Sequence, residues 1–286
     1  MSEFRLQVGN VEIIALSDMN CVYPTPLAEL WPMVPPEAWQ IYREQYPDTF
    51  EDGLMRLEIG CYLVRSQGLT VLIDSGYGPG PIDYVGGLRG QLMNDLASKK
   101  VQPEDIDLVF LSHLHLDHVG WNTTEQAGTL VPTFPRARYM AHQADLDHFR
   151  KPEVQALARY SYMGRLVEPL VNLGVFDSVE GDTDLSDELK AIHTPGHTPG
   201  HMSILVSSAG QHALIQGDVL IHPAQVTEDS WCPLFDEDFE LATETRRKIL
   251  DQVEADGITV VSCHFPAPGL GRVLRYEGRR YWQVGL

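Results

Sequence analysis

The sequence predicts a mixed α/β protein in which two β-sheets form the core and helices cover them. Three observations support this fold class. Short apolar runs with β-strand character occur through the whole chain, helical stretches separate them, and the order strands, helices, strands, helix repeats along the sequence. A two-sheet core covered by helices allows both kinds of element to bury their apolar faces.

Turn residues and apolar periodicity place the elements in order. Turns at Gly9-Asn10 and near Gln67-Gly68 indicate two hairpins close to the N-terminus. The expected strands are 4–8, 11–17, 57–64, 69–73, 107–112, 137–141, 189–192, 202–206, 213–215, 258–264, 272–276 and 281–284. The expected helices are 88–99, 143–150, 152–167 and 238–255.

We expect residues 1–286 to form a single domain, because many sandwich folds of this length do so. Residues 20–55 differ from the rest, since their six prolines prevent long regular structure and their six aromatic side chains need an apolar surface. This segment is expected to pack on the body of the protein or on a second subunit of a homodimer. The alternative is a lid that forms one wall of a substrate pocket.

Composition excludes several classes of protein. The net charge of −19, from 21 basic and 40 acidic residues, argues against a nucleic-acid partner. No apolar run is long enough to span a membrane, and the N-terminus lacks a secretion signal. Four scattered cysteines indicate reduced thiols and a cytoplasmic protein. Cys263 adjoins a candidate ligand, His264, and its side chain is expected on the opposite side of the strand.

The most informative motif is His113-Leu-His115-Leu-Asp117-His118, directly after the expected strand 107–112. Residues two apart in an extended segment point the same way, so His113 and His115 can bind one cation together. Asp117 and His118 follow a turn and can face a second cation. Four metal-binding side chains in six residues at a strand end therefore predict a metal site.

Three more expected strands are followed by a histidine or an aspartate. His197 lies in the turn-rich stretch 193–201, Asp218 follows strand 213–215, and His264 ends strand 258–264. Strands in one sandwich bring their ends to one rim, so we expect these side chains to join the first cluster.

These residues resemble the motifs of the metallo-β-lactamase superfamily over most of the chain. The first motif is similar to residues 70–76, which include Asp74. The next four are similar to the cluster His113, His115, Asp117 and His118, to His197, to Asp218 and to His264. The resemblance implies a four-layer αββα sandwich with two metal ions at the loops of the sheets.

The resemblance also implies which residues bind each ion. By position, one ion would be held by His113, His115 and His197, the other by Asp117, His118 and His264, and both by Asp218. Five imidazoles and two carboxylates suit Zn²⁺, while Fe, Mn and Co are also compatible. Asp74 is expected to accept a hydrogen bond from a ligand histidine or a loop amide and so to orient the site.

Two cations would lower the pKa of a bridging water and produce a hydroxide nucleophile. Asp117 is expected to carry a proton to the leaving group. His222 is expected to contact the substrate or leaving group, with an ordinary loop histidine as the alternative. Trp121, Trp231, Phe235 and Phe265 lie near ligands in the sequence and are candidates for the pocket, or else ordinary core residues.

Among branches of the superfamily, the stretches 217–223 and 262–271 look most similar to the lactonase and methyl-parathion-hydrolase branch. Asp218 argues against β-lactam hydrolysis, and Ile221-His222 departs from the tyrosine of many acyl-homoserine lactonases. We expect a dinuclear metal hydrolase that opens a lactone or cleaves a related ester. The alternatives are a phosphotriesterase or aryl esterase, a di-iron redox protein, and a non-catalytic binding protein on the same fold.

Overall fold

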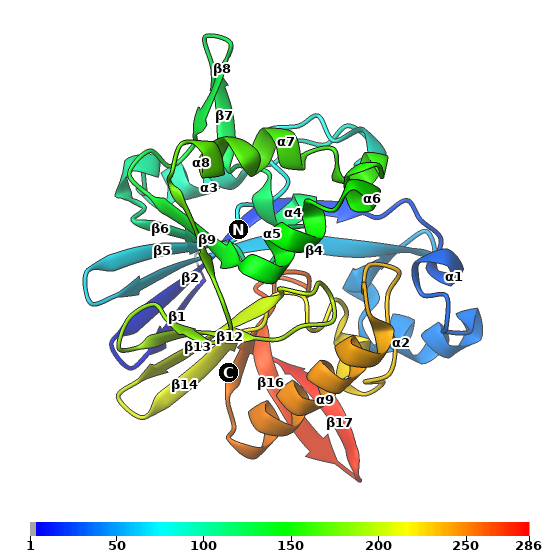
Figure 1. Ribbon diagram of the computed structural model, residues 1–286. Helices are drawn as coiled ribbons and strands as arrows, with labels where there is room; N and C mark the ends of the chain where they lie inside the picture. Colours follow the sequence, from blue (N-terminus) through cyan, green and yellow to red (C-terminus); the bar gives the residue numbers. More distant parts are fainter. Residues whose placement is uncertain (1–3, 286) are drawn as a thin grey trace.

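The computed structural model describes residues 4–285 and contains two large β-sheets (Figure 1). The first, eight-stranded sheet contains β1 (Arg5–Val8), β2 (Val11–Val22), β3 (Phe50–Glu51), β4 (Leu54–Ser66), β5 (Leu69–Ile73), β6 (Leu108–Phe110), β9 (Arg138–His142) and β10 (Phe176–Val179). The second, seven-stranded sheet contains β11 (Thr183–Asp184), β12 (Leu189–His193), β13 (Met202–Ser208), β14 (Gln211–Ile215), β15 (Thr259–Val261), β16 (Leu270–Tyr276) and β17 (Arg279–Val284). A separate hairpin is formed by β7 (Thr123–Gln126) and β8 (Thr129–Pro132).

The strand directions bring several loops to one edge. In the first sheet β1, β2, β4 and β5 are antiparallel neighbours, whereas β5, β6, β9 and β10 run parallel. In the second sheet β12 and β14 are both antiparallel to β13, and β14 is parallel to β15. The strands β12, β14 and β15 therefore run in the same direction, and their carboxyl ends lie at the same edge of the second sheet.

Helices cover the outer faces of the sheets. They are α1 (Leu27–Leu30), α2 (Gln40–Gln45), α3 (Leu92–Ser98), α4 (Leu116–Val119), α5 (Gln143–Phe149), α6 (Pro152–Gln155), α7 (Met163–Leu166), α8 (Glu168–Asn172) and α9 (Phe239–Ala255). Only α9, at 17 residues, is long among the helices of the described part of the chain, and the side chain of Asp238 caps it by accepting a hydrogen bond from Leu241 N.

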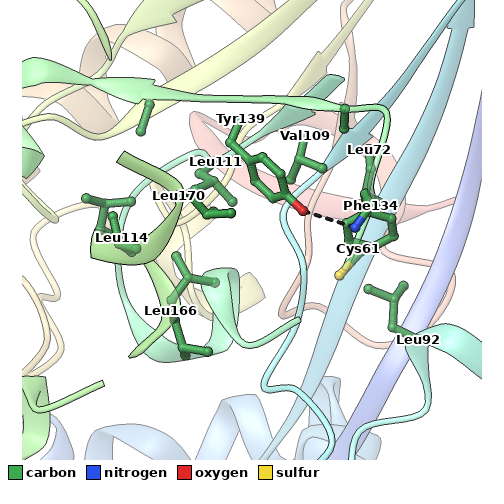
Figure 2. Packing of buried hydrophobic residues seen from close by; sticks show 14 of the residues in the cluster. Cys61, Leu72, Leu92, Val109, Leu111, Leu114, Phe134, Tyr139, Leu166 and Leu170 are labelled. Atoms are coloured by element: carbon green, nitrogen blue, oxygen red, sulfur yellow. Dashed lines mark hydrogen bonds between the residues drawn. The ribbon is translucent and has the colours of Figure 1, made fainter. Parts of the chain in front are cut away.

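The layers follow the order helix, sheet, sheet, helix, which confirms the predicted αββα sandwich (Figure 1). Between the sheets, Phe110 of the first packs in one cluster with Ile204 of the second. On the outer face of the first sheet, Tyr139 of β9 and Leu166 of α7 belong to a second cluster (Figure 2). Helix α9 covers the second sheet through a third cluster that includes Leu250.

Two helix predictions need correction. The expected helix 152–167 is broken into α6, a 3-10 turn at Ala158–Tyr160, and α7. The Tyr160 hydroxyl donates to Glu237 and the Tyr162 hydroxyl donates to Leu114 O. Side chains two apart on a continuous α-helix point in nearly opposite directions and could not both reach this region. The expected helix 88–99 begins only at Leu92, where the side chain of Asp18 accepts a hydrogen bond from the Leu92 amide.

Residues 20–55 contain only short elements between the end of β2 and the start of β4. Trp31 and Trp39 are fully buried and pack in the same cluster as Ile221 and Leu250, so the segment lies on the α9 side of the second sheet (Figure 1). The packing on the body of the protein is thus observed, and a role as a lid or in a dimer stays a prediction.

No helix within residues 4–285 is long and apolar enough to cross a membrane. All four cysteines of the chain are buried and none forms a disulfide.

Candidate metal centre

Four loops at the ends of strands carry the predicted ligands. The cluster 113–118 follows β6, His197 follows β12, Asp218 follows β14 and His264 follows β15. Because these ends meet at one edge of the sandwich, residues 147 positions apart in the sequence come together: His264 Nε2 lies 3.6 Å from Asp117 Oδ2.

His113, His115 and His197 form one group of nitrogen atoms. His115 Nδ1 lies 3.0 Å from His113 Nε2 and 3.0 Å from His197 Nε2. The ligand atoms of a tetrahedral zinc ion, at 2.0–2.1 Å from the metal, are about 3.3 Å apart. The three nitrogen atoms therefore fit around one cation.

Asp117, His118 and His264 form a second group. Asp117 Oδ2 lies 3.6 Å from His118 Nε2 and 3.6 Å from His264 Nε2. His118 Nε2 is buried and has no hydrogen-bond partner among residues 4–285. An unpartnered buried nitrogen is costly unless something binds it, and a metal ion would do so.

Asp218 lies between the two groups. Its Oδ2 is 3.3 Å from His197 Nε2 and 3.8 Å from His113 Nε2 on one side, and 3.5 Å from His118 Nε2 and 3.2 Å from His264 Nε2 on the other. A single carboxylate oxygen thus faces imidazoles of both groups, as a ligand shared by two ions would.

The electrostatics of His113, His115 and Asp218 suit metal binding. For His118, His197 and His264 burial opposes protonation, but nearby carboxylates, Asp218 above all, raise the pKa in the metal-free protein. Burial, together with the neighbouring imidazoles, holds the pKa of His113 and of His115 well below its ordinary value, so both rings are neutral. Burial opposes ionisation of Asp218, but His264, His118 and His113 hold its pKa well below the ordinary value. Neutral imidazoles and an ionised carboxylate are the forms that bind divalent cations.

The second ring nitrogen of three of the predicted ligands is held by another protein group. Asp74 Oδ2 lies 2.9 Å from His118 Nδ1, and both Asp74 oxygens also accept hydrogen bonds from Ser112. His197 Nδ1 lies 2.8 Å from Asp236 Oδ1, and His264 Nδ1 donates to a backbone oxygen, that of Glu58, at 2.7 Å. Such contacts fix ring orientation and tautomer. The Asp74 contact was expected from the sequence, whereas Asp236 lies in a loop without a recognisable motif.

His201 holds the backbone of Asp218. Its Nε2 accepts a hydrogen bond from Asp218 N at 2.8 Å, and its Nδ1 lies 2.9 Å from Thr194 Oγ1. Burial lowers the pKa of His201 to about 3, which keeps Nε2 free to accept. At the intervening Gly217, with φ +58°, a Cβ would lie 2.6 Å from His201 Nε2, so only glycine fits.

Cys263 differs from the prediction. Its side chain does not point away from the site, because Cys263 Sγ lies 3.2 Å from Asp218 Oδ1. The reason is that β15 ends at Val261, so the alternation of a strand no longer determines the direction of residue 263. The thiol lies within 4.8 Å of ligand atoms of His118, Asp218 and His264.

His222 is buried in an aromatic environment formed by the 20–55 segment. Its Nε2 lies 2.7 Å from Thr49 Oγ1, and its Nδ1 accepts a hydrogen bond from Ala224 N. The rings of Trp39 and Phe50 lie 5.2 and 5.3 Å away. Both ring nitrogens of His222 are thus bound by protein groups.

The candidate pocket residues lie in different surroundings. Trp121 Nε1 donates to Asp18. Trp231 packs on Trp39, and Phe265 is fully buried against Trp282. The structure thus brings together the seven predicted ligands and Asp74 but not this aromatic set.

Phe235 adjoins Asp236 and packs edge-on against Tyr23, whose ring in turn contacts Tyr84. Tyr23 belongs to the aromatic 20–55 segment singled out from the sequence, whereas Tyr84, in the loop before α3, was not named as a candidate from the sequence.

Comparison with known proteins gives one family. The family model described as Metallo-beta-lactamase superfamily matches residues 57–264. An N-acyl homoserine lactonase from Bacillus sp. is 27% identical over 173 residues, which are 54% of this chain and 60% of that protein. This chain thus spans less than two thirds of that relative in the comparison.

Two solved structures share the fold over almost the whole chain. The hydrolase AbOPH of the β-lactamase superfamily has a TM-score of 0.86 at 24% identity, covering 98% of this chain and 96% of its own. AidC, a dizinc quorum-quenching lactonase solved with N-hexanoyl-L-homoserine, has a TM-score of 0.83 at 20% identity, covering 99% and 97%.

Proposed function

The chain belongs to the metallo-beta-lactamase superfamily, and we propose that it is a hydrolase that uses two divalent metal ions to open a lactone or cleave a related ester. The observation that carries this proposal is the position of Asp218 Oδ2, within 3.8 Å of imidazole nitrogens from both groups. The seven ligands proposed are His113, His115, Asp117, His118, His197, Asp218 and His264.

The donor set determines the metals that fit. Five imidazoles and two carboxylates favour Zn²⁺, with Fe, Mn and Co as alternatives. Two such ions, when bound, lower the pKa of a water molecule to near neutrality and polarise a carbonyl oxygen. The chain itself keeps His113 and His115 neutral, orients the rings of His118 and His197 through Asp74 and Asp236, and excludes water from most of the proposed ligands.

Asp117 is the residue proposed to move a proton. Its side chain is 20% exposed, compared with 4% for Asp218, so its carboxylate faces the solvent side of the site. A carboxylate in this position can accept a proton from the attacking water and donate it to the leaving oxygen.

The contacts of His222 favour a positioning role over the substrate contact expected from the sequence. Both of its ring nitrogens form hydrogen bonds with protein groups, one of them with Thr49. We propose that His222 fastens the 20–55 segment to the loop that follows Asp218 and so acts on the site through that loop.

The names of relatives support a lactone as substrate, since an N-acyl homoserine lactonase shares 27% identity with this chain. A phosphotriester or aryl ester is the second candidate, because the same two-metal chemistry attacks phosphoryl and activated acyl groups. The net charge of −19 favours a small uncharged substrate over nucleic acid.

The test is a substrate panel on zinc-loaded protein, with homoserine lactones of several acyl lengths, aryl esters and phosphotriesters. Turnover of lactones should exceed turnover of phosphotriesters, and all hydrolysis should disappear when a chelator removes the metal. If the protein before zinc loading contains iron near two equivalents with charge-transfer absorption, and hydrolyses none of these substrates, a di-iron redox protein is supported instead. Metal binding without turnover of any ester would support a binding protein.

A further inference from the structure

Asp145 is a buried carboxylate close to the metal centre that is not among the proposed ligands. It is the third residue of α5, and its exposed fraction is 0%. Within residues 4–285 it forms no ion pair with a lysine or arginine, and burial raises its pKa to about 6. A buried carboxylate without a cationic partner is costly, so its hydrogen bonds need an explanation.

The two oxygens of Asp145 bind both loops that carry the three-histidine group. Oδ2 accepts hydrogen bonds of 3.0 Å from Leu114 N and of 3.0 Å from Thr198 Oγ1, and Oδ1 accepts one of 2.6 Å from Gly200 N. Leu114 stands between His113 and His115, and Thr198 directly follows His197. A single carboxylate thus joins the loop after β6 to the loop after β12.

The groups around Asp145 leave the two loops little conformational freedom. A Cβ on Gly200 would lie 2.6 Å from Asp145 N and 2.8 Å from Asp145 Oδ1, so the loop approaches α5 as closely as only glycine allows. The carbonyl of Leu114 is held from the other side by the Tyr162 hydroxyl at 2.8 Å. The backbone of Leu114, which lies between His113 and His115, is therefore fixed at both its N–H and its C=O.

A second buried carboxylate holds the other half of the site. Asp18 accepts hydrogen bonds from Tyr77 N at 2.7 Å and from Trp121 Nε1 at 2.8 Å. Tyr77 lies three residues after Asp74, and Trp121 lies three residues after His118. Asp18 therefore contacts the segments around the second group. Asp145 and Asp18 therefore act on different loops.

We propose that Asp145 is a positioning residue that sets the spacing of His113, His115 and His197, and with it the affinity of this group for its metal ion. The inference rests on the proposed two-metal site. Asp145 keeps the two loops at the separation that places three nitrogens around one cation, and it contacts neither substrate nor metal. The second group does not depend on it.

The test is a zinc titration in competition with a chromophoric chelator, which yields an affinity for each of the two ions. Two reference variants show which affinity belongs to which group. His115→Ala removes one ligand of the first group, and His264→Ala removes one ligand of the second. Asp145→Asn replaces one acceptor oxygen by an NH2 group, which cannot accept a hydrogen bond from the loops. We expect it to weaken the first affinity by about tenfold or more and the second by less than about twofold.

Control variants separate position from charge and from folding. Asp147→Asn, on the exposed side of α5, removes the same charge and is expected to leave both affinities unchanged. Thr198→Val deletes one hydrogen bond to Asp145 and leaves the carboxylate in place. It is expected to weaken the first affinity less than Asp145→Asn does, and it replaces that variant if the latter does not fold.

Amide hydrogen exchange of the metal-free protein gives a readout independent of zinc. Leu114 and Gly200 amides should be protected in the parent protein and should exchange faster in Asp145→Asn. Equal weakening of both zinc affinities, or no change in either, would overturn the inference. If the parent protein binds fewer than two zinc ions, the proposed function fails, and the exchange data alone decide whether Asp145 holds the two loops together.

Discussion

Asp236 Oδ1 lies 2.8 Å from His197 Nδ1, while Asp236 Oδ2 accepts a hydrogen bond of 3.0 Å from Arg246 Nη2. Asp236 and Arg246 are both buried, so the guanidinium compensates the carboxylate in place of water. Arg246 also donates to the backbone oxygens of Val219, Asp229 and Trp231. The ring of the proposed ligand His197 is thus oriented from α9 through one carboxylate.

The substitution Asp236→Ala should lower the affinity for zinc at the three-histidine group. The ring of His197 loses the acceptor that holds Nε2 toward the site, and loss of such partners costs about 10–100-fold in metal affinity. Chelator competition measures the effect. Glu244→Ala, an exposed change on α9, is the control and should bind zinc normally. Unchanged affinity in Asp236→Ala would show that the ring is held by other contacts.

The substitution Arg246→Met should destabilise the fold more than any exposed arginine change. It leaves Asp236 buried without its cation, which costs about 3–5 kcal/mol in the free energy of unfolding. The neighbouring Arg247 pairs with Asp229 at the surface, so Arg247→Met should cost only about 0–1 kcal/mol. Denaturant unfolding of the two variants provides the comparison, and similar midpoints would contradict this account of the pair.

The substitution His118→Ala should reduce lactone or ester turnover by about a hundredfold or more and lower the bound metal. His118 Nε2 faces both carboxylates of the site, at 3.6 Å from Asp117 and 3.5 Å from Asp218. Elemental analysis and steady-state kinetics on the same sample measure the two effects. His212→Ala, an exposed change on β14, should leave both unchanged. Near-normal turnover with full metal content in His118→Ala would argue strongly against the two-metal hydrolase.

The sequence predicts the parts of this molecule that are encoded locally. Apolar runs rich in β-branched residues identify most strands of both sheets, and ligands placed directly after them identify the loops of the site. The alternation rule gives the right outcome for His113 and His115, although both lie beyond the end of β6 at Phe110. It does not hold at Cys263, where β15 has already ended and the thiol turns toward Asp218. Beyond the end of a strand, therefore, local periodicity does not determine the direction of a side chain, and tertiary contacts do.

Residues that act through tertiary contacts leave no local signal. Asp145 and Asp236 occur in stretches with no motif, and their partners lie up to 55 positions away for Asp145 and 39 for Asp236. The break in the expected helix 152–167 has the same origin, since Tyr160 and Tyr162 bind groups from distant loops. Helical periodicity predicts the apolar face of a segment but not the contacts that interrupt it.

The pH dependence of stability offers a test of the environment of His222. Burial lowers the pKa of His222 to about 3, and its ring neighbours include Trp39, Tyr46 and Phe50, none of them charged near neutral pH. An imidazole in the unfolded chain takes up its proton near pH 6.5. The unfolded state therefore binds one more proton than the folded state between about pH 6.5 and 3, and the free energy of unfolding falls as the pH is lowered.

This residue alone should contribute up to about 1.4 kcal/mol per pH unit across that range. His222→Gln removes the titrating group, so its free energy of unfolding should fall less steeply with acid than that of the parent protein. Denaturant unfolding of both metal-free proteins between pH 7 and 4 gives the two slopes, and their difference cancels the titration of the ligand histidines. Equal slopes would mean that His222 is protonated in the folded protein, which its hydrogen bond from Ala224 N to Nδ1 does not allow.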